Sequence, residues 1–316
     1  MDSLSVLLIS FGVGIVVGLT GMGGGALMTP ALIFVGVNPA AAVANDLVAA
    51  SINKSVGAAV HWKQGSPNLR LAGWLIAGSV PFAFVGGFIV KAFDPARTDD
   101  ILMTAIGVAL LFAAASYTLR ILLQQRLLAS GNVTSNEITL RPGWTFLVGA
   151  VGGLLVGITS VGSGSLIMVA LLMLYPTLSA VKLVGTDLVQ AVPLVLAAAV
   201  GHVLNMGVDW SVLIPLIIGG TPGTYLGARI SSWINQSVIR RGIVIVLTLT
   251  GLKMLGVSPT WIGILGAGML LLGPLAWGAV RHVVGLPAFD DNRSAWRSAD
   301  QSTTAEQPDR GRSPLT

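Results

Sequence analysis

Cysteine is absent from this chain of 316 residues. Its absence excludes disulfide bonds, thiolate nucleophiles and cysteine-ligated metals. Charge is also scarce, because charged residues make up 10% of the sequence, against about 25% in a typical soluble domain. Hydrophobic residues make up 53%, and the mean hydropathy is +0.82. This composition predicts an integral membrane protein in contact with a lipid bilayer.

The formal net charge is +5, but its distribution argues against a nucleic-acid partner. The Lys and Arg residues lie at the ends of apolar segments and in the C-terminal tail, not on one amphipathic face. The stretch after Met1 lacks the basic region of a secretory signal, so we expect it to stay in the mature protein.

A glycine-rich segment occurs twice. Gly18–Leu27 reads GLTGMGGGAL, and 139 residues later Gly157–Leu166 reads GITSVGSGSL. Other pairs recur at a spacing of 141, namely Asp46/Asp187, His61/His202, Gly78/Gly219, Pro81/Pro222 and Gly86/Gly227. The register predicts two repeats of one ancestral unit. Non-helical backbone at membrane depth survives only where protein buries it or where it lines a cavity, so the paired breaks indicate one shared binding site.

Seven apolar segments are long enough to cross a hydrocarbon core of about 30 Å. They cover residues 40–61, 71–91, 100–122, 179–203, 210–232, 238–255 and 260–280. The segments beside the glycine loops are shorter: Leu4–Gly18 reaches about 22 Å as a helix and Ala26–Val37 about 18 Å. Each loop is therefore expected at the tip of a re-entrant helical hairpin.

The predicted fold is an all-α polytopic membrane protein with two inverted-topology repeats. Each repeat holds one hairpin and three transmembrane helices, and an odd number of crossings inverts the second repeat. This topology collects most Lys and Arg on one face, as the positive-inside rule requires, with the N-terminus outside and the C-terminus cytoplasmic. The predicted parts are a first repeat (1–123), a cytoplasmic linker (124–142), a second repeat (143–256), an additional helix (259–282) and a disordered tail (287–316).

The two loops, with Gly185-Thr186-Asp187 and Gly201-His202 followed by Gly207 and Asp209, resemble the TauE/SafE sulfite exporter family over residues 5–255. In the first repeat Asn45-Asp46 stands where the second has Thr186-Asp187. The resemblance implies transport of sulfite, sulfoacetate or related sulfonates across the bacterial cytoplasmic (inner) membrane, by a multi-pass protein.

The loops supply the predicted substrate site. Helix N-termini that meet at the midplane favour an anion, glycine lets backbone approach closely, and hydroxyl groups donate hydrogen bonds. The alternative is that these glycines serve helix packing. The predicted loop residues are Thr20, Gly21, Gly23, Gly24, Gly25, Thr159, Ser160, Gly162, Ser163, Gly164 and Ser165.

Lys54 lies near mid-depth, where a cation costs about 2.5 to 3.5 kcal/mol. We expect it to neutralise the anion beside Asn53, or else to form a structural salt bridge with Asp46. Gln190, one helical turn after Asp187 and on the same helical face, is a further candidate for contact with the substrate. Asp46 and Asp187 are candidate caps, cation partners or proton relays, and His61 and His202 are expected at helix ends on opposite faces, as caps or interfacial residues or in a gating role.

These residues favour a secondary transporter that alternates access around the two loops. An anion channel with the loops as its filter is the alternative. An intramembrane hydrolase using Ser163 or Ser165 with His202 is disfavoured, because it would require a base oriented beside the serine and because the repeated loops suit a symmetric binding site better. We expect no enzyme activity, no cofactor and no metal, and a homo-oligomer is compatible with the sequence.

Overall fold

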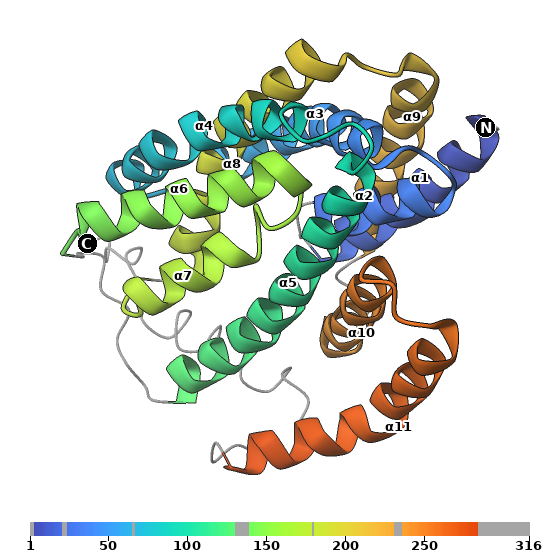
Figure 1. The fold of residues 1–316 in the computed structure, drawn as a ribbon. Coiled ribbons are helices and arrows are strands. Elements are labelled where there is room, and N and C mark those ends of the chain that lie inside the picture. The colour runs from blue at the N-terminus through green and yellow to red at the C-terminus, as the bar shows by residue number, and fades with distance from the viewer. Residues whose placement is uncertain are drawn as a thin grey trace, which may run out of the picture. The chain divides into compact units, whose positions relative to one another are not determined.

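The structure is a computed structural model that describes residues 3–20, 24–64, 67–129, 139–178, 180–230 and 236–283. Within these ranges the chain forms eleven α-helices and no strand (Figure 1). Contacts divide the chain into two units, Met1–Ala267 and Gly268–Thr316. The first unit contains α1–α10, and the described part of the second is the C-terminal portion of α11. The predicted tail at 287–316 lies outside the described residues.

Each repeat contributes five helices in the same order. The first repeat forms α1 (Ser3–Thr20), α2 (Gly25–Phe34), α3 (Pro39–Gln64), α4 (Leu69–Lys91) and α5 (Thr98–Ala129). The second forms α6 (Pro142–Thr159), α7 (Leu166–Leu174), α8 (Ala180–Met206), α9 (Trp210–Ile230) and α10 (Gln236–Met254), and α11 (Pro259–Val283) follows. All seven predicted long segments are helical, with ends that fall within a few residues of the predicted ones except at α5. There the helix continues through six residues predicted as linker, because Leu, Gln, Arg and Ala all favour helix.

Six helices of the described chain are long and apolar enough to cross a membrane: Ser3–Thr20, Leu69–Lys91, Thr98–Leu123, Pro142–Thr159, Lys182–Met206 and Trp210–Ile230. The chain is therefore a polytopic helical membrane protein. The predicted spans at 40–61, 238–255 and 260–280 are helical but are not among the six. Charged residues interrupt the first two, with Asp46 and Lys54 in α3 and Arg240, Arg241 and Lys253 in α10. In α11 the apolar stretch Pro259–Gly273 is shorter than a span.

The helices on either side of each glycine loop are unequal. Both α1 and α6 have 18 residues, a length of about 27 Å, so the limb before the loop is longer than the sequence predicted. The limb after the loop is short, since α2 has ten residues and α7 has nine, or about 15 and 14 Å.

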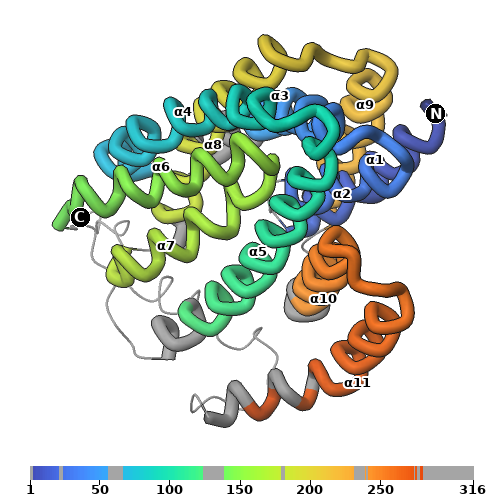
Figure 2. Tube along the Cα trace, viewed as in Figure 1, coloured from blue at the N-terminus to red at the C-terminus, as the bar shows by residue number. Residues whose placement is uncertain are grey.

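The two repeats interlock by exchanging helices. Helix α1 packs along α9 of the other repeat, and its counterpart α6 packs along α4. Helix α3 packs against its counterpart α8, and α5 packs against its counterpart α10 (Figure 2). Corresponding helices of the two repeats therefore pack in reciprocal pairs.

Glycine contacts repeat the same exchange at the level of single residues. A side chain at Gly14 or Gly18 in α1 would collide with the carbonyl oxygen of Gly220 or Thr224 in α9. At the equivalent places, Gly153 and Gly157 in α6 would collide with the carbonyl oxygens of Ser79 and Ala83 in α4. Small residues let membrane helices approach backbone to backbone, which explains why glycines recur at the repeat spacing.

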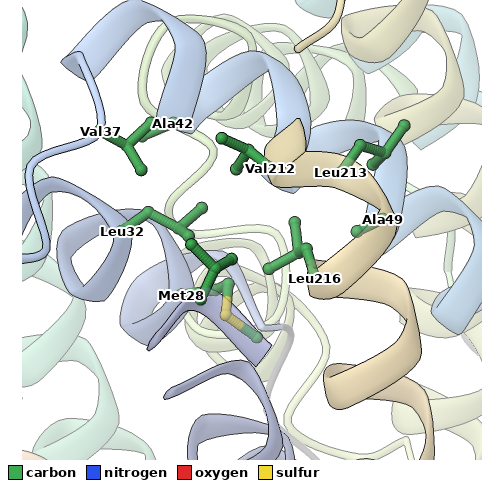
Figure 3. Packing of buried hydrophobic residues seen from close by; sticks show 9 residues of the cluster. Met28, Leu32, Val37, Ala42, Ala49, Val212, Leu213 and Leu216 are labelled. Carbon is green, nitrogen blue, oxygen red and sulfur yellow. The ribbon is translucent and has the colours of Figure 1, made fainter. Parts of the chain in front are cut away.

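Apolar packing joins the first hairpin to the second repeat. Met28 and Leu32 of α2 contact Ala42 and Ala49 of α3 and Leu216 of α9 in one buried cluster (Figure 3). The cluster fixes the start of α3 beside α2, and Asp46 lies between these two alanines in the sequence.

Replacing Gly153 by alanine tests the close packing. The new methyl group would overlap the Ser79 carbonyl, and overpacking costs about 1–3 kcal/mol. We expect Gly153→Ala to lower the thermal unfolding midpoint in detergent. Gly143→Ala, in the same helix with nothing within 4 Å, should leave the midpoint unchanged or raise it through helix propensity. Equal midpoints for the two variants would contradict the packing.

Candidate functional site

The two glycine-rich loops meet inside the first unit. Gly25 begins α2, and a side chain added there would overlap the carbonyl oxygen of Ser160 in the other loop. Gly24 precedes it and accepts the first amide hydrogen bonds of α2, from Leu27 and Met28. The predicted residues Gly21 and Gly23 lie outside the described part of the chain. The structure thus brings together the described ends of both loops, as the repeat predicts.

The second loop reverses the chain through two residues with positive φ. Ser160 has φ 60° and Gly162 has φ 105°. Ser160 is the one non-glycine with positive φ among the described residues, a conformation that costs about 1–3 kcal/mol. The first repeat has Gly21 at the corresponding position. A serine in a backbone conformation that favours glycine indicates that the serine side chain makes a necessary contact.

That side chain reaches Asp46. The carboxylate oxygen Oδ2 of Asp46 accepts hydrogen bonds from Ser160 Oγ at 2.7 Å and from Thr29 Oγ1 at 2.6 Å. All three residues are buried. Thr29 belongs to α2, Asp46 to α3 and Ser160 to the second loop, so one carboxylate joins α2, α3 and the second loop.

Lys54 reaches the same loop two turns further along α3. Its ammonium donates a hydrogen bond to Ser163 Oγ, and the residue is half-buried. Lys54 also interacts electrostatically with Asp46 and Asp187, and Asp187 with Arg120. Oδ1 of Asp187 has no hydrogen-bond partner among the described residues. The structure thus brings Lys54 into contact with the second loop.

The remaining loop hydroxyls have different partners. Thr20 Oγ1 donates to Val17 O at 3.1 Å, and Thr159 Oγ1 donates to Leu155 O at 2.6 Å while accepting from Val161 N at 3.2 Å. These hydrogen bonds satisfy backbone groups at the C-terminal ends of α1 and α6. Ser165 is buried at the start of α7 and makes no side-chain cap there, and Gly164 precedes it.

Two other predicted residues contact neighbouring helices. Gln190 Nε2 donates to Ser79 Oγ of α4 at 2.9 Å, while Gln190 Oε1 has no partner among the described residues. Asn53 Oδ1 accepts from Thr221 Oγ1 of α9 at 3.0 Å. Both side chains therefore join the two repeats.

His202 lies between helices near the C-terminal ends of α6 and α8. The side chain is fully buried, and its Nε2 lies 2.6 Å from the carbonyl oxygen of Gly157 in α6. The cause is close packing, because Gly201 and Gly157 both meet α4 without side chains and leave the histidine between helices. His61 lies in α3, and its side chain is outside the described part of the structure.

Sequence reasoning missed Thr29 and Ser79. Neither polar residue recurs in the other repeat, where Met168 and Gly220 occupy the corresponding positions. Their only sequence signal is a hydroxyl in an otherwise apolar helix. Over the described residues, no group of three or more His, Asp or Glu side chains is placed to hold a metal ion.

Fold and site together define a polytopic membrane protein with a buried polar cluster between two interlocked repeats. The profile of the Sulfite exporter TauE/SafE family matches residues 6–254. The chain belongs to the TauE/SafE family.

Curated relatives carry transporter names. The chain is 36% identical over 261 residues to "Probable membrane transporter protein YjnA" of Bacillus subtilis (strain 168), covering 80% of this chain and 100% of the relative. It is 25% identical over 254 residues to YdhB of the same strain, covering 79% and 99%. A "Probable membrane transporter protein" of Xylella fastidiosa (strain 9a5c) is 28% identical over 246 residues, covering 75% and 88%. No solved structure matches the chain significantly.

Removing the Thr29 hydroxyl tests the carboxylate bridge. Thr29→Val keeps the shape and deletes one donor to Asp46, and a hydrogen bond to a charged group contributes about 1.5–3 kcal/mol. We expect a lower unfolding midpoint in detergent. Thr118→Val is the matched control, since that hydroxyl bonds only the Ala114 carbonyl of its own helix at 2.9 Å. A midpoint for Thr29→Val no lower than for Thr118→Val would refute the bridge.

Proposed function

We propose that this protein is a secondary transporter that moves a small anion, namely sulfite, sulfoacetate or a related sulfonate, across the bacterial cytoplasmic membrane. Its substrate site lies where the two glycine-rich loops meet. The observation that carries the proposal is the convergence of Gly25, Ser160 and Ser163, from both loops, with the ammonium of Lys54. The substrate class comes from the family and not from the geometry.

The convergence suits an anion for electrostatic reasons. Helices α2 and α7 both begin at the loops, so their first amide groups carry partial positive charge into the site. Lys54 adds a full charge, and Ser163 and Ser165 add hydroxyl donors. A sulfite or sulfonate group has three oxygens that can accept from such donors at once.

The carboxylates limit how strongly the site holds its anion. Asp46 and Asp187 both interact with Lys54, so part of the lysine charge is balanced before substrate arrives. Asp46 is a positioning residue in this account, because its hydroxyl partners hold the loops. A site that neutralises an anion only in part can also release it, which transport requires.

Interlocked repeats favour a carrier over a channel. Helices α1 and α6 each pack against the opposite repeat through glycines, and such smooth contacts permit one bundle to rock against the other around a fixed site. In the proposed topology the repeats are inverted, with the N-terminus outside and the C-terminus cytoplasmic. An anion channel remains the second candidate, with the same loops as its filter.

Counterflow in proteoliposomes tests this function. With labelled sulfite, sulfoacetate, sulfate and a small carboxylate as the panel, we expect saturable, trans-stimulated exchange of a sulfur anion. Lys54→Gln should raise the half-saturating concentration about 10- to 100-fold, the equivalent of losing a charge-assisted hydrogen bond of about 1.5–3 kcal/mol.

Lys91→Gln is the matched control, because Lys91 is an exposed lysine at the end of α4 and its loss changes net charge equally. Flux without saturation or trans-stimulation would favour the channel. Exchange of no anion in the panel would contradict the proposed substrate class. Equal half-saturating concentrations in wild type and Lys54→Gln would show that Lys54 does not bind the substrate.

A further inference from the structure

Helices α4 and α9 occupy equivalent places in the two repeats and begin in the same way. Asn68 caps α4, with its Oδ1 accepting from Leu71 N at 3.1 Å, and its carbonyl accepts from Ala72 N at 2.9 Å. Asp209, 141 residues later, accepts at Oδ1 from Ser211 N at 2.9 Å, and its carbonyl accepts from Leu213 N at 2.8 Å. The two helix starts are therefore directly comparable.

The start of α4 is closed against the other repeat. The backbone amide of Asn68 donates to Thr186 Oγ1 of α8 at 3.0 Å. Pro67 lies in van der Waals contact with the side-chain position of Gly185, also in α8. Beyond this point α4 continues along α8 in an extensive interface.

The equivalent place at α9 is open. The interface between α9 and α3 is much smaller than that between α4 and α8. A cleft of about 800 Å³ lies at the start of α9, and we call it the α3–α9 cleft; its lining includes Asn45, Asp99, Val208 and Asp209. Asn45 corresponds to Thr186 at the spacing of 141, so it is the counterpart of the residue that closes the other end.

Asn45 carries the acceptor that a closing bond requires. Its side chain is fully buried, with Nδ2 donating to Ala41 O at 2.8 Å. Its Oδ1 has no hydrogen-bond partner among the described residues, although a buried polar atom without one is costly. The equivalent of the Asn68–Thr186 bond would run from the amide of Asp209 to this oxygen.

We infer that these two helix starts are alternating gates, with the Asn68–Thr186 gate closed and the Asn45–Asp209 gate open in this structure. In the second state the Asp209 amide donates to Asn45 Oδ1 and closes the α3–α9 cleft, while the Asn68–Thr186 bond breaks. This inference rests on the proposed transport function, since only a carrier needs two gates that exclude each other.

The gates connect directly to the substrate site. Asn45 precedes Asp46, which holds Thr29 and Ser160, and Thr186 precedes Asp187, which interacts with Lys54. Movement of either gate therefore displaces a carboxylate beside the lysine. The first repeat has Asn45 where the second has Thr186. An asparagine amide extends further from the backbone than a threonine hydroxyl, so it can reach across the open cleft.

Disulfide trapping tests the two gates, and the cysteine-free chain is a ready background. The pairs are Asn68→Cys with Thr186→Cys and Asn45→Cys with Asp209→Cys, each in the full chain in proteoliposomes. Disulfides form where Cα atoms come within about 7 Å. We expect the first pair to cross-link in the resting protein and the second only during sulfite or sulfonate counterflow. Either cross-link should stop counterflow, and reduction should restore it.

Each single-cysteine variant is the control for its own pair, and its counterflow should be the same before and after oxidant. Thiol labelling of detergent-solubilised protein gives an independent readout, and should modify Asp209→Cys, which is exposed at the open cleft, faster in resting protein than Asn68→Cys, which is half-buried at the closed gate. Equal modification of the two, or normal counterflow while the Asn45/Asp209 pair never cross-links, would overturn the gates. Absent counterflow in wild type would instead refute the proposed function, and the labelling comparison would still report on the gates.

Discussion

One buried carboxylate holds the centre of this protein together. Asp46 accepts hydrogen bonds from Thr29 in its own repeat and from Ser160 in the other. A buried anion without such donors would be strongly destabilising, so the two hairpin loops and α3 are required to stay in register. That register also places Lys54 against Ser163, which makes the carboxylate the organiser of the proposed anion site.

Glycine contacts allow the rest of the fold to form around this centre. Where α1 meets α9 and α6 meets α4, backbones touch without intervening side chains. Membrane helices gain little from burying apolar surface against each other, so close packing supplies much of their association. The same contacts lack interlocking side chains, which is what the proposed rocking of one repeat against the other would require.

Hydropathy and the internal repeat were enough to predict the helices, and the repeat predicted that the two loops meet. They were also enough to identify Lys54 as a candidate site residue, because a cation inside an apolar segment is energetically costly and usually has a functional role. The hydrogen-bond partners of these residues were harder to predict from the sequence. Thr29 and Ser79 have no counterpart in the other repeat, and His202 is buried by helix packing that hydropathy does not encode. Side-chain partners across helices depend on relative rotation, which a pattern along one helix does not fix.

The central claim is that the meeting point of the loops binds the anion, and anomalous diffraction from crystals soaked in selenite, a sulfite analogue, tests it most directly. We expect a selenium peak within hydrogen-bonding distance of Lys54 Nζ and Ser163 Oγ, beside the start of α2. The peak should disappear in Lys54→Gln crystals that keep the same fold. A peak confined to any other part of the protein, with none beside Lys54, would contradict the account.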